Sequence, residues 1–194
     1  MFVGRKQELA TLERLYRSDT FQMPVVYGRR RVGKTSLITE FVKGKPAIFF
    51  SARESTAKEN LVALSQAIAD LQLDGTPVAS DTAAPVFASF EEAFTHVFSL
   101  AQQQRIVFVI DEFPYLAQSD RSVSSVLQHL IDHRKEGSRL FLILCGSSMS
   151  FMEHQVLGYK SPLYGRRTAQ IKVQPFDIMQ ASLLLGGSSS EDIV

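Results

Sequence analysis

Short apolar runs alternate with amphipathic stretches along most of the chain. The runs predict strands, and they read PVVYG, AIFFSA, IVFVIDEF, LFLILCGS and AQIKVQPF, of which the last alternates between apolar and polar residues. Between them, apolar residues recur every three or four positions, which predicts helices over residues 6–17, 34–42, 55–71, 89–103 and 121–134. Strands that alternate with helices indicate a three-layer α/β fold, in which helices cover both faces of a parallel sheet.

Local signals define several boundaries of these elements. Ser55 is expected to cap the helix over 55–71, and the SFEE stretch beginning at Ser89 fits a capping box. Small residues without periodicity predict a loop over 74–85. The Ser-rich stretch 186–194 is unlike a packed element, so we expect the core domain to span residues 1–185 and the tail to begin a linker.

Composition and charge narrow the possible classes of protein. The chain has 194 residues, 45% of them hydrophobic, which suits one domain with a sizeable core. Its net charge of +1 argues against a general nucleic-acid binder, although a local basic patch stays possible. A single cysteine, Cys145, excludes a disulfide within the chain and suits a reducing compartment. Without an apolar signal segment or a run long enough to span a bilayer, we expect a cytoplasmic protein with no membrane partner.

The stretch GRRRVGKT, from residue 28 to residue 35, matches the phosphate-binding pattern G-x-x-x-x-G-K-[ST] at every fixed position. In this pattern glycines let backbone N–H groups converge on phosphates, Lys34 reaches the β- and γ-phosphates, and Thr35 ligates Mg²⁺. The residues expected to hold the nucleotide are therefore Gly28, Arg29, Arg30, Arg31, Val32, Gly33, Lys34, Thr35 and Ser36. Because this loop binds through its backbone, the three arginine side chains are expected to face solvent, with a subunit or polynucleotide contact as the alternative.

Two acidic residues end the apolar run IVFVIDEF. Carboxylates at the carboxyl end of a strand lie where open α/β sheets bind their ligands. Asp111 is therefore expected to hold Mg²⁺, and Glu112 to orient or deprotonate an attacking water, which indicates a hydrolase. Two solvated acids at a strand end are the alternative interpretation.

Other polar positions carry weaker signals. Ser147 or Ser148 follows the run LFLILC and is placed to contact the γ-phosphate or the attacking water, although a Gly-Ser turn explains the same letters. Arg166 and Arg167 precede the last strand; one of them is expected to act as an arginine finger, and a surface pair of cations is the alternative. His129 and His133 lack the glutamate of a zinc-protease helix, and Cys145 lacks the surroundings of a nucleophile.

Taken in order, these motifs resemble the prokaryotic "archaeal ATPase" family, which belongs to the AAA+-related, STAND-like branch of P-loop ATPases. The stretches that carry the resemblance are FVGRKQEL, VVYGRRRVGKTSL, IVFVIDEFPYL, LILCGSSMSFM and SPLYGRRTAQIKVQPF, and they cover nearly the whole chain. The resemblance implies a five-stranded parallel sheet of order 5-1-4-3-2, with LFLILCGS between the phosphate-loop strand and the Asp-Glu strand.

The resemblance also implies roles for individual residues, with ATP and Mg²⁺ as ligands. Val3, Gly4 and Arg5 correspond to the segment that lies against adenine. Ser147 falls at the position of a polar γ-phosphate sensor. Arg166 falls where a family member presents an arginine finger, with Arg167 competing for that role.

Members of this family continue into a lid and often a further C-terminal domain, whereas this chain stops soon after PFDIMQASLLLGG. We therefore expect the ATPase core of a longer protein, in which nucleotide state switches the absent domains and the core alone binds weakly and hydrolyses slowly. A homo-oligomer is one possible arrangement. A nucleotide-gated DNA-associated protein, related to origin-recognition ATPases, is the alternative function, and a P-loop kinase is a weaker one. A GTPase is disfavoured because no NKxD-type segment occurs.

Overall fold

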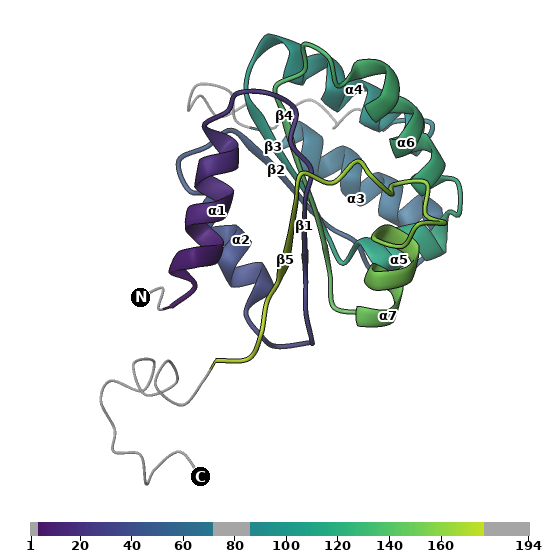
Figure 1. Ribbon diagram of the computed structural model, residues 1–194. Helices are drawn as coiled ribbons and strands as arrows, with labels where there is room; N and C mark the ends of the chain where they lie inside the picture. The colour runs from purple at the N-terminus through teal and green to yellow at the C-terminus, as the bar shows by residue number, and fades with distance from the viewer. Residues whose placement is uncertain (1–3, 72–85, 177–194) are drawn as a thin grey trace, which may run out of the picture.

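A single parallel sheet forms the centre of the molecule. The computed structural model (Figure 1) describes residues 4–71 and 86–176. The strands are β1 (Pro24–Tyr27), β2 (Ala47–Ser51), β3 (Ile106–Asp111), β4 (Leu140–Gly146) and β5 (Ala169–Lys172). Their order is β2-β3-β4-β1-β5, and every pairing is parallel. This is the expected order 5-1-4-3-2 read from the opposite edge, and LFLILCGS occupies the expected slot between β1 and β3.

The burial of each strand follows its place in the sheet. Every residue of β3 and β4 is buried, as continuous apolar runs predict for central strands covered on both faces. The edge strands β2 and β5 instead alternate buried and more exposed positions. In register, Val25 of β1 and Ile110 of β3 both pair with Leu144 of β4. The residues that follow these three strands therefore meet at one edge of the sheet.

Helices cover both faces of the sheet, as the alternating pattern predicts. The helices α1 (Lys6–Tyr16) and α2 (Lys34–Val42) pack on one face, through a cluster that includes Leu12 and Phe41. The other face carries α3 (Ala57–Ala69), α4 (Phe90–Gln103), α5 (Phe113–Ser119) and α6 (Val123–Arg134). A short turn, α7 (Met149–Phe151), continues into the π-helical turn η1 (Met152–Val156) after β4. No helix among the described residues is both long and apolar enough to cross a membrane.

The helix boundaries confirm one expected cap and correct another. Ser89 accepts a hydrogen bond from the backbone N–H of Glu92, as the capping-box pattern predicts. The cap of α3 is Thr56 rather than Ser55: Thr56 and Glu59 form a reciprocal capping box, which lowers the pKa of Glu59. The sequence pattern did not reveal α5, α7 or η1. The loop expected over 74–85 and the domain boundary at residue 185 lie outside the described residues.

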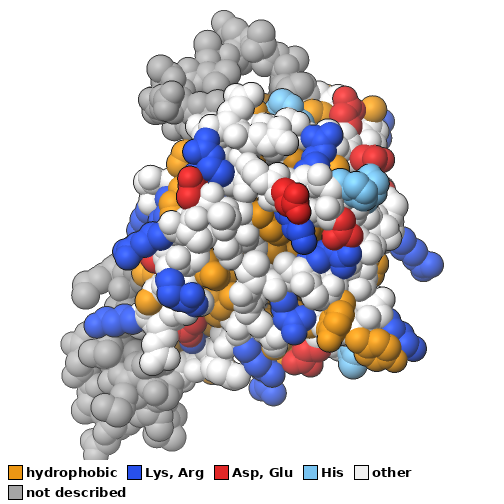
Figure 2. Space-filling view, turned by 45° about the horizontal axis from the view of Figure 1, so that its top comes forward, with side chains coloured by type: hydrophobic (Ala, Val, Ile, Leu, Met, Phe, Trp, Pro, Cys, Tyr) orange, Lys and Arg blue, Asp and Glu red, His pale blue; other side chains and the backbone are white. Residues whose placement is uncertain are grey.

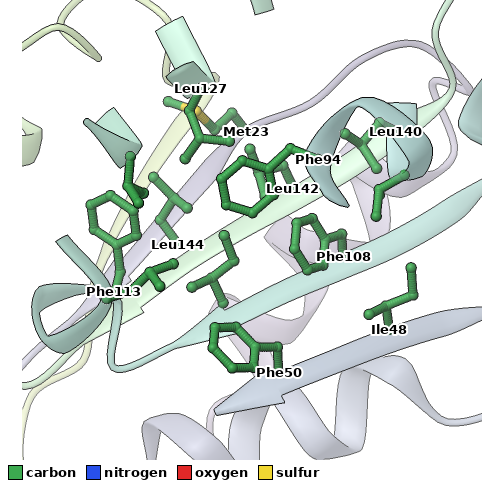
Figure 3. Packing of buried hydrophobic residues seen from close by; sticks show 14 of the residues in the cluster. Met23, Ile48, Phe50, Phe94, Phe108, Phe113, Leu127, Leu140, Leu142 and Leu144 are labelled. Carbon is green, nitrogen blue, oxygen red and sulfur yellow. The ribbon is translucent and has the colours of Figure 1, made fainter. Parts of the chain in front are cut away.

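The larger core cluster holds the central strands in place (Figure 3). Phe94 of α4 and Phe108 of β3 pack with their ring centroids 6.0 Å apart, and Leu142 of β4 lies beside them. Phe113 extends this cluster to the start of α5, directly after the Asp-Glu pair. Truncating a buried phenylalanine of this kind costs about 3–5 kcal/mol of unfolding free energy. The packing of this cluster therefore fixes the positions of the strand ends that carry polar residues.

Candidate nucleotide-binding site

The expected phosphate loop joins the end of β1 to the start of α2. Arg31 and Gly33 both adopt left-handed backbone conformations, with φ of 64° and 88°, so the loop turns sharply before α2 begins at Lys34. Gly28 is required for space, because a Cβ atom there would lie 2.3 Å from the carbonyl oxygen of Val173. The loop thus presents the backbone N–H groups at the start of α2 to one edge of the sheet, the geometry that binds phosphate.

The side chain of Lys34 folds back against the phosphate loop. It is only 6% exposed, and its ammonium group donates hydrogen bonds to the carbonyl oxygens of Gly28, at 3.1 Å, and Arg29, at 2.9 Å. These contacts hold the charge at the mouth of the loop. A phosphate group at the loop would offer Lys34 stronger, charge-assisted acceptors than these carbonyls.

Thr35 and Asp111 meet at the same place, although they are far apart in the sequence. The hydroxyl of Thr35 donates to a carboxylate oxygen of Asp111 at 2.9 Å. Asp111 is 4% exposed, and none of the ion pairs among the described residues involves it. A buried carboxylate without a cationic partner, next to a hydroxyl oxygen, offers the hard oxygen donors that Mg²⁺ prefers, so these residues fit the expected ion.

The only cysteine of the sequence lies just below this pair. Cys145 is fully buried in β4, and burial raises the pKa of its thiol well above the ordinary value, with the nearby carboxylate of Asp111 adding to the effect. A thiol kept protonated in the core is not a nucleophile, which agrees with its interpretation as a small core residue.

Glu112 is held against the end of β4. Its carboxylate accepts hydrogen bonds from both the backbone N–H of Ser147, at 3.1 Å, and the hydroxyl of Ser147, at 2.9 Å. Glu112 itself has a left-handed backbone, with φ of 51°, as it turns from β3 into α5. Gly146 permits this approach, because a Cβ atom there would lie 2.8 Å from Pro114 and 2.6 Å from Met152.

Of the two candidate serines, the structure brings Ser147 to the site. Ser147 lines an open cavity of about 440 Å³ between the loop and the start of α5. Ser148 is exposed and precedes α7. The residues that line the cavity are Arg30, Arg31, Gly33, Lys34, Thr35, Ser36, Glu112, Tyr115 and Ser147.

Tyr115 is a lining residue that the sequence pattern did not single out. Its hydroxyl accepts a hydrogen bond of 2.9 Å from the guanidinium of Arg30, which ties the loop to α5. The available signal was Pro114, since proline favours the first turn of a helix and would have indicated α5 directly after the Asp-Glu pair. All three arginines of the loop are exposed, as expected, and Arg30 makes its contact with Tyr115 at the surface.

The N-terminal segment lies behind the loop and not in this cavity. Val3 falls outside the described residues. Gly4 packs against Phe176, and a Cβ atom at Gly4 would lie 2.8 Å from that ring. Arg5 is 7% exposed and donates to the carbonyl oxygen of Val32 at 2.9 Å. The donors of Arg5 are thus directed at protein groups, two carbonyls and the carboxylate of Glu8.

Arg166 and Arg167 lie at the far end of the sheet from the loop. They precede β5, whose amino end is fixed by the bond from Thr168 N–H to the Met23 carbonyl. The guanidinium of Arg166 forms two hydrogen bonds with Asp132, at 2.8 and 2.5 Å, and these lower the pKa of the Asp132 carboxyl. Arg167 donates to the carbonyl of Leu157 at 3.4 Å. The structure does not bring either arginine to the nucleotide cavity of its own chain.

Comparisons with known proteins agree with this geometry. Residues 2–191 match the family described as "ATPase domain predominantly from Archaea". An uncharacterized protein of Methanocaldococcus jannaschii is 33% identical over 175 residues, which cover 90% of this chain and 36% of that protein. The chain therefore spans about a third of the length of this relative.

Solved structures share the fold. A Walker-type ATPase of Pyrococcus abyssi superposes with a TM-score of 0.70 and 24% identity, covering 99% of this chain and 61% of that one. The ORC1 protein of Aeropyrum pernix, solved in complex with DNA, gives a TM-score of 0.64 and 18% identity, covering 96% and 49%. The sheet order, the phosphate loop and the match over nearly the whole chain lead to one conclusion: this chain belongs to the family of ATPase domains found predominantly in Archaea.

Proposed function

We propose that this domain binds ATP together with Mg²⁺ and hydrolyses it, and that the nucleotide state acts as a switch for other regions of the protein. The contact between Thr35 and Asp111 carries this proposal. It joins the end of the phosphate loop to the end of β3 and sets a buried carboxylate beside the cavity. Glu112 follows immediately and reaches the same cavity.

Each residue has a chemical task in this proposal. The N–H groups of the loop and the start of α2 hold the phosphates, and Lys34 turns from the loop carbonyls toward the β- and γ-phosphates. Thr35 and Asp111 hold the ion, directly or through water. The chemistry that Mg²⁺ supplies in this position is neutralisation of the phosphate oxygens during transfer.

Glu112 is the proposed catalytic base. It would orient an attacking water and accept its proton, while the bond between the γ-phosphorus and the bridging oxygen breaks to release ADP and phosphate. The carboxylate of Glu112 accepts hydrogen bonds from both the N–H and the hydroxyl of Ser147, so Ser147 determines the position of the proposed base. We therefore assign Ser147 to positioning Glu112. The sensor role that the resemblance implies would need the hydroxyl to turn from Glu112 to the γ-phosphate, because it has a single proton to donate.

Substitution of Lys34 tests nucleotide binding directly. Lys34→Ala in the full-length protein should weaken ATP binding by roughly a hundredfold, since it removes a charge-assisted contact to phosphate. Lys43→Ala, at a side chain that is 65% exposed, is the matched control and should leave the Kd unchanged. Equal affinities of the two variants for ATP would argue against the proposed site.

DNA association is the second candidate function, favoured by the fold shared with an ORC1 protein solved with DNA and by the exposed Arg29 and Arg31. Basic and acidic side chains are interspersed over the face seen in Figure 2, so that face offers no continuous basic surface. Binding to duplex DNA with a steep salt dependence, lost in Arg29→Ala/Arg31→Ala, would support this function. Unchanged binding in that variant would exclude these two arginines as the contact.

A further inference from the structure

Arg5 connects the phosphate loop to the segment that follows β5. Its guanidinium donates to the carbonyl oxygen of Val32 at 2.9 Å and also to the carbonyl oxygen of Gln174. The same group lies 4.2 Å above the centre of the Phe176 ring, and Glu8 accepts a third bond at 3.3 Å. Arg5 is nearly buried, and its Nε atom finds no hydrogen-bond partner among the described residues. Arg5 thus combines an ion pair to Glu8, in the adjoining helix α1, with bonds to two carbonyls from distant segments, and these two bonds are what connects the segments.

The loop carbonyl that Arg5 holds lies at a sensitive position. Val32 stands between Arg31 and Gly33, the two residues with left-handed backbones. A shift of the Val32 carbonyl therefore changes the direction of the N–H groups that lead into α2. Arg5 thus fixes the shape of the loop from behind, without lining the cavity.

Two further contacts link the loop to the same segment. The N–H of Val173 donates to the carbonyl of Tyr27 at 2.7 Å, directly before the loop. Gly28 lies so close to Val173 that no Cβ atom fits between them. A second cavity, of about 350 Å³, borders Arg29 and residues 172–175, so the segment has space to move on that side.

We propose that Arg5 is a positioning residue that couples the state of the phosphate loop to residues 173–176, the segment through which the chain leaves the sheet. When nucleotide reshapes the loop, the Val32 carbonyl moves, and Arg5 transmits this movement to Gln174 and Phe176. This inference rests on the proposed nucleotide switch, and it identifies the contacts through which a change in the loop would reach the segment after β5. Lysine should not reproduce these contacts, because one guanidinium nitrogen of Arg5 serves both carbonyls while the other terminal nitrogen reaches Glu8 and the group stays 4.2 Å from the centre of the Phe176 ring.

Hydrogen exchange on the full-length protein tests the coupling. The probe is a non-hydrolysable ATP analogue with Mg²⁺, and the variants are Arg5→Lys and the matched control Arg14→Lys, at an exposed arginine of α1. In the control, nucleotide should slow exchange in residues 28–33 and 173–176. In Arg5→Lys, protection of 173–176 should fall by about tenfold, the loss expected for a hydrogen bond to a charged group, while the loop stays protected.

Two results would overturn the coupling: equal protection of 173–176 in both variants, or no protection there in wild-type protein that binds the analogue. If neither the wild-type protein nor any variant binds the analogue, the proposed function fails. The coupling is then tested by hydrogen exchange on the proteins without nucleotide. Arg5→Lys should then speed exchange in both segments relative to Arg14→Lys, and an unchanged rate in either segment contradicts it. Should Arg5→Lys not fold, Gly4→Ala displaces Phe176 instead and must give the same uncoupling.

Discussion

The carboxylate of Glu112 is held by the backbone N–H and the hydroxyl of Ser147, across the ends of two adjacent strands. Under the proposed function this contact sets the position of the catalytic base before nucleotide arrives. Substitution of Ser147 by alanine removes the hydroxyl and keeps the backbone N–H, so the contribution of the hydroxyl can be measured separately from that of the N–H.

Ser147→Ala should therefore lower the rate of ATP hydrolysis while leaving the Kd for ATP unchanged. The loss should be about tenfold, because one of two hydrogen bonds to a charged group disappears. Ser148→Ala, at the exposed neighbour, should retain wild-type hydrolysis. Identical rates for the two variants would show that the Ser147 hydroxyl does not position Glu112.

Thr35→Val removes the hydroxyl beside Asp111 and keeps the shape of the side chain. ATP binding should then require about tenfold more Mg²⁺, since one oxygen donor of the proposed site is lost. Titration of nucleotide binding against Mg²⁺ measures this shift. Thr11→Val, on α1, is the control. An unchanged Mg²⁺ requirement in Thr35→Val would contradict the assignment of Thr35 as a ligand.

The ion pair between Asp132 and Arg166 predicts a pH-dependent term in stability. Because the hydrogen bond from Arg166 lowers the pKa of Asp132, its stabilisation is present above about pH 4 and is lost as pH falls through the lowered value. Solvent exposure limits the contribution to about 0.5–1 kcal/mol at neutral pH and low salt. Urea unfolding of Asp132→Asn should show this deficit at pH 7 and a smaller one at pH 3. A deficit that is equal at both pH values would contradict the pairing.

The phosphate loop and the Asp-Glu pair were predictable because their signals are local. A glycine-framed pattern between a strand and a helix specifies backbone geometry within a few residues, and the structure brings Thr35 to Asp111 as that pattern implies. The sheet order came from the family resemblance, since hydrophobic periodicity predicts strands without fixing which of them are neighbours.

The remaining features depend on contacts between distant parts of the chain. Arg5 donates to the carbonyls of Val32 and Gln174, which lie 27 and 169 positions further along the chain. The sequence around Arg5 therefore gives no indication of these partners. Arg30 reaches Tyr115 across 85 positions. Arg166 was expected near a nucleotide, yet the structure pairs it with Asp132, 34 positions away, at the opposite end of the sheet. An action of Arg166 on the nucleotide of a second copy stays a prediction.

Substitution of Glu112 by glutamine tests the central claim most directly. Glu112→Gln keeps the size of the side chain and its contact with Ser147, but it removes the proposed base. In the full-length protein with Mg²⁺, ATP should bind with an unchanged Kd while hydrolysis falls by roughly a hundredfold or more. Glu136→Gln, at an exposed residue after α6, should hydrolyse ATP at the wild-type rate. Parallel loss of binding and hydrolysis in Glu112→Gln, or loss of neither, would contradict the account.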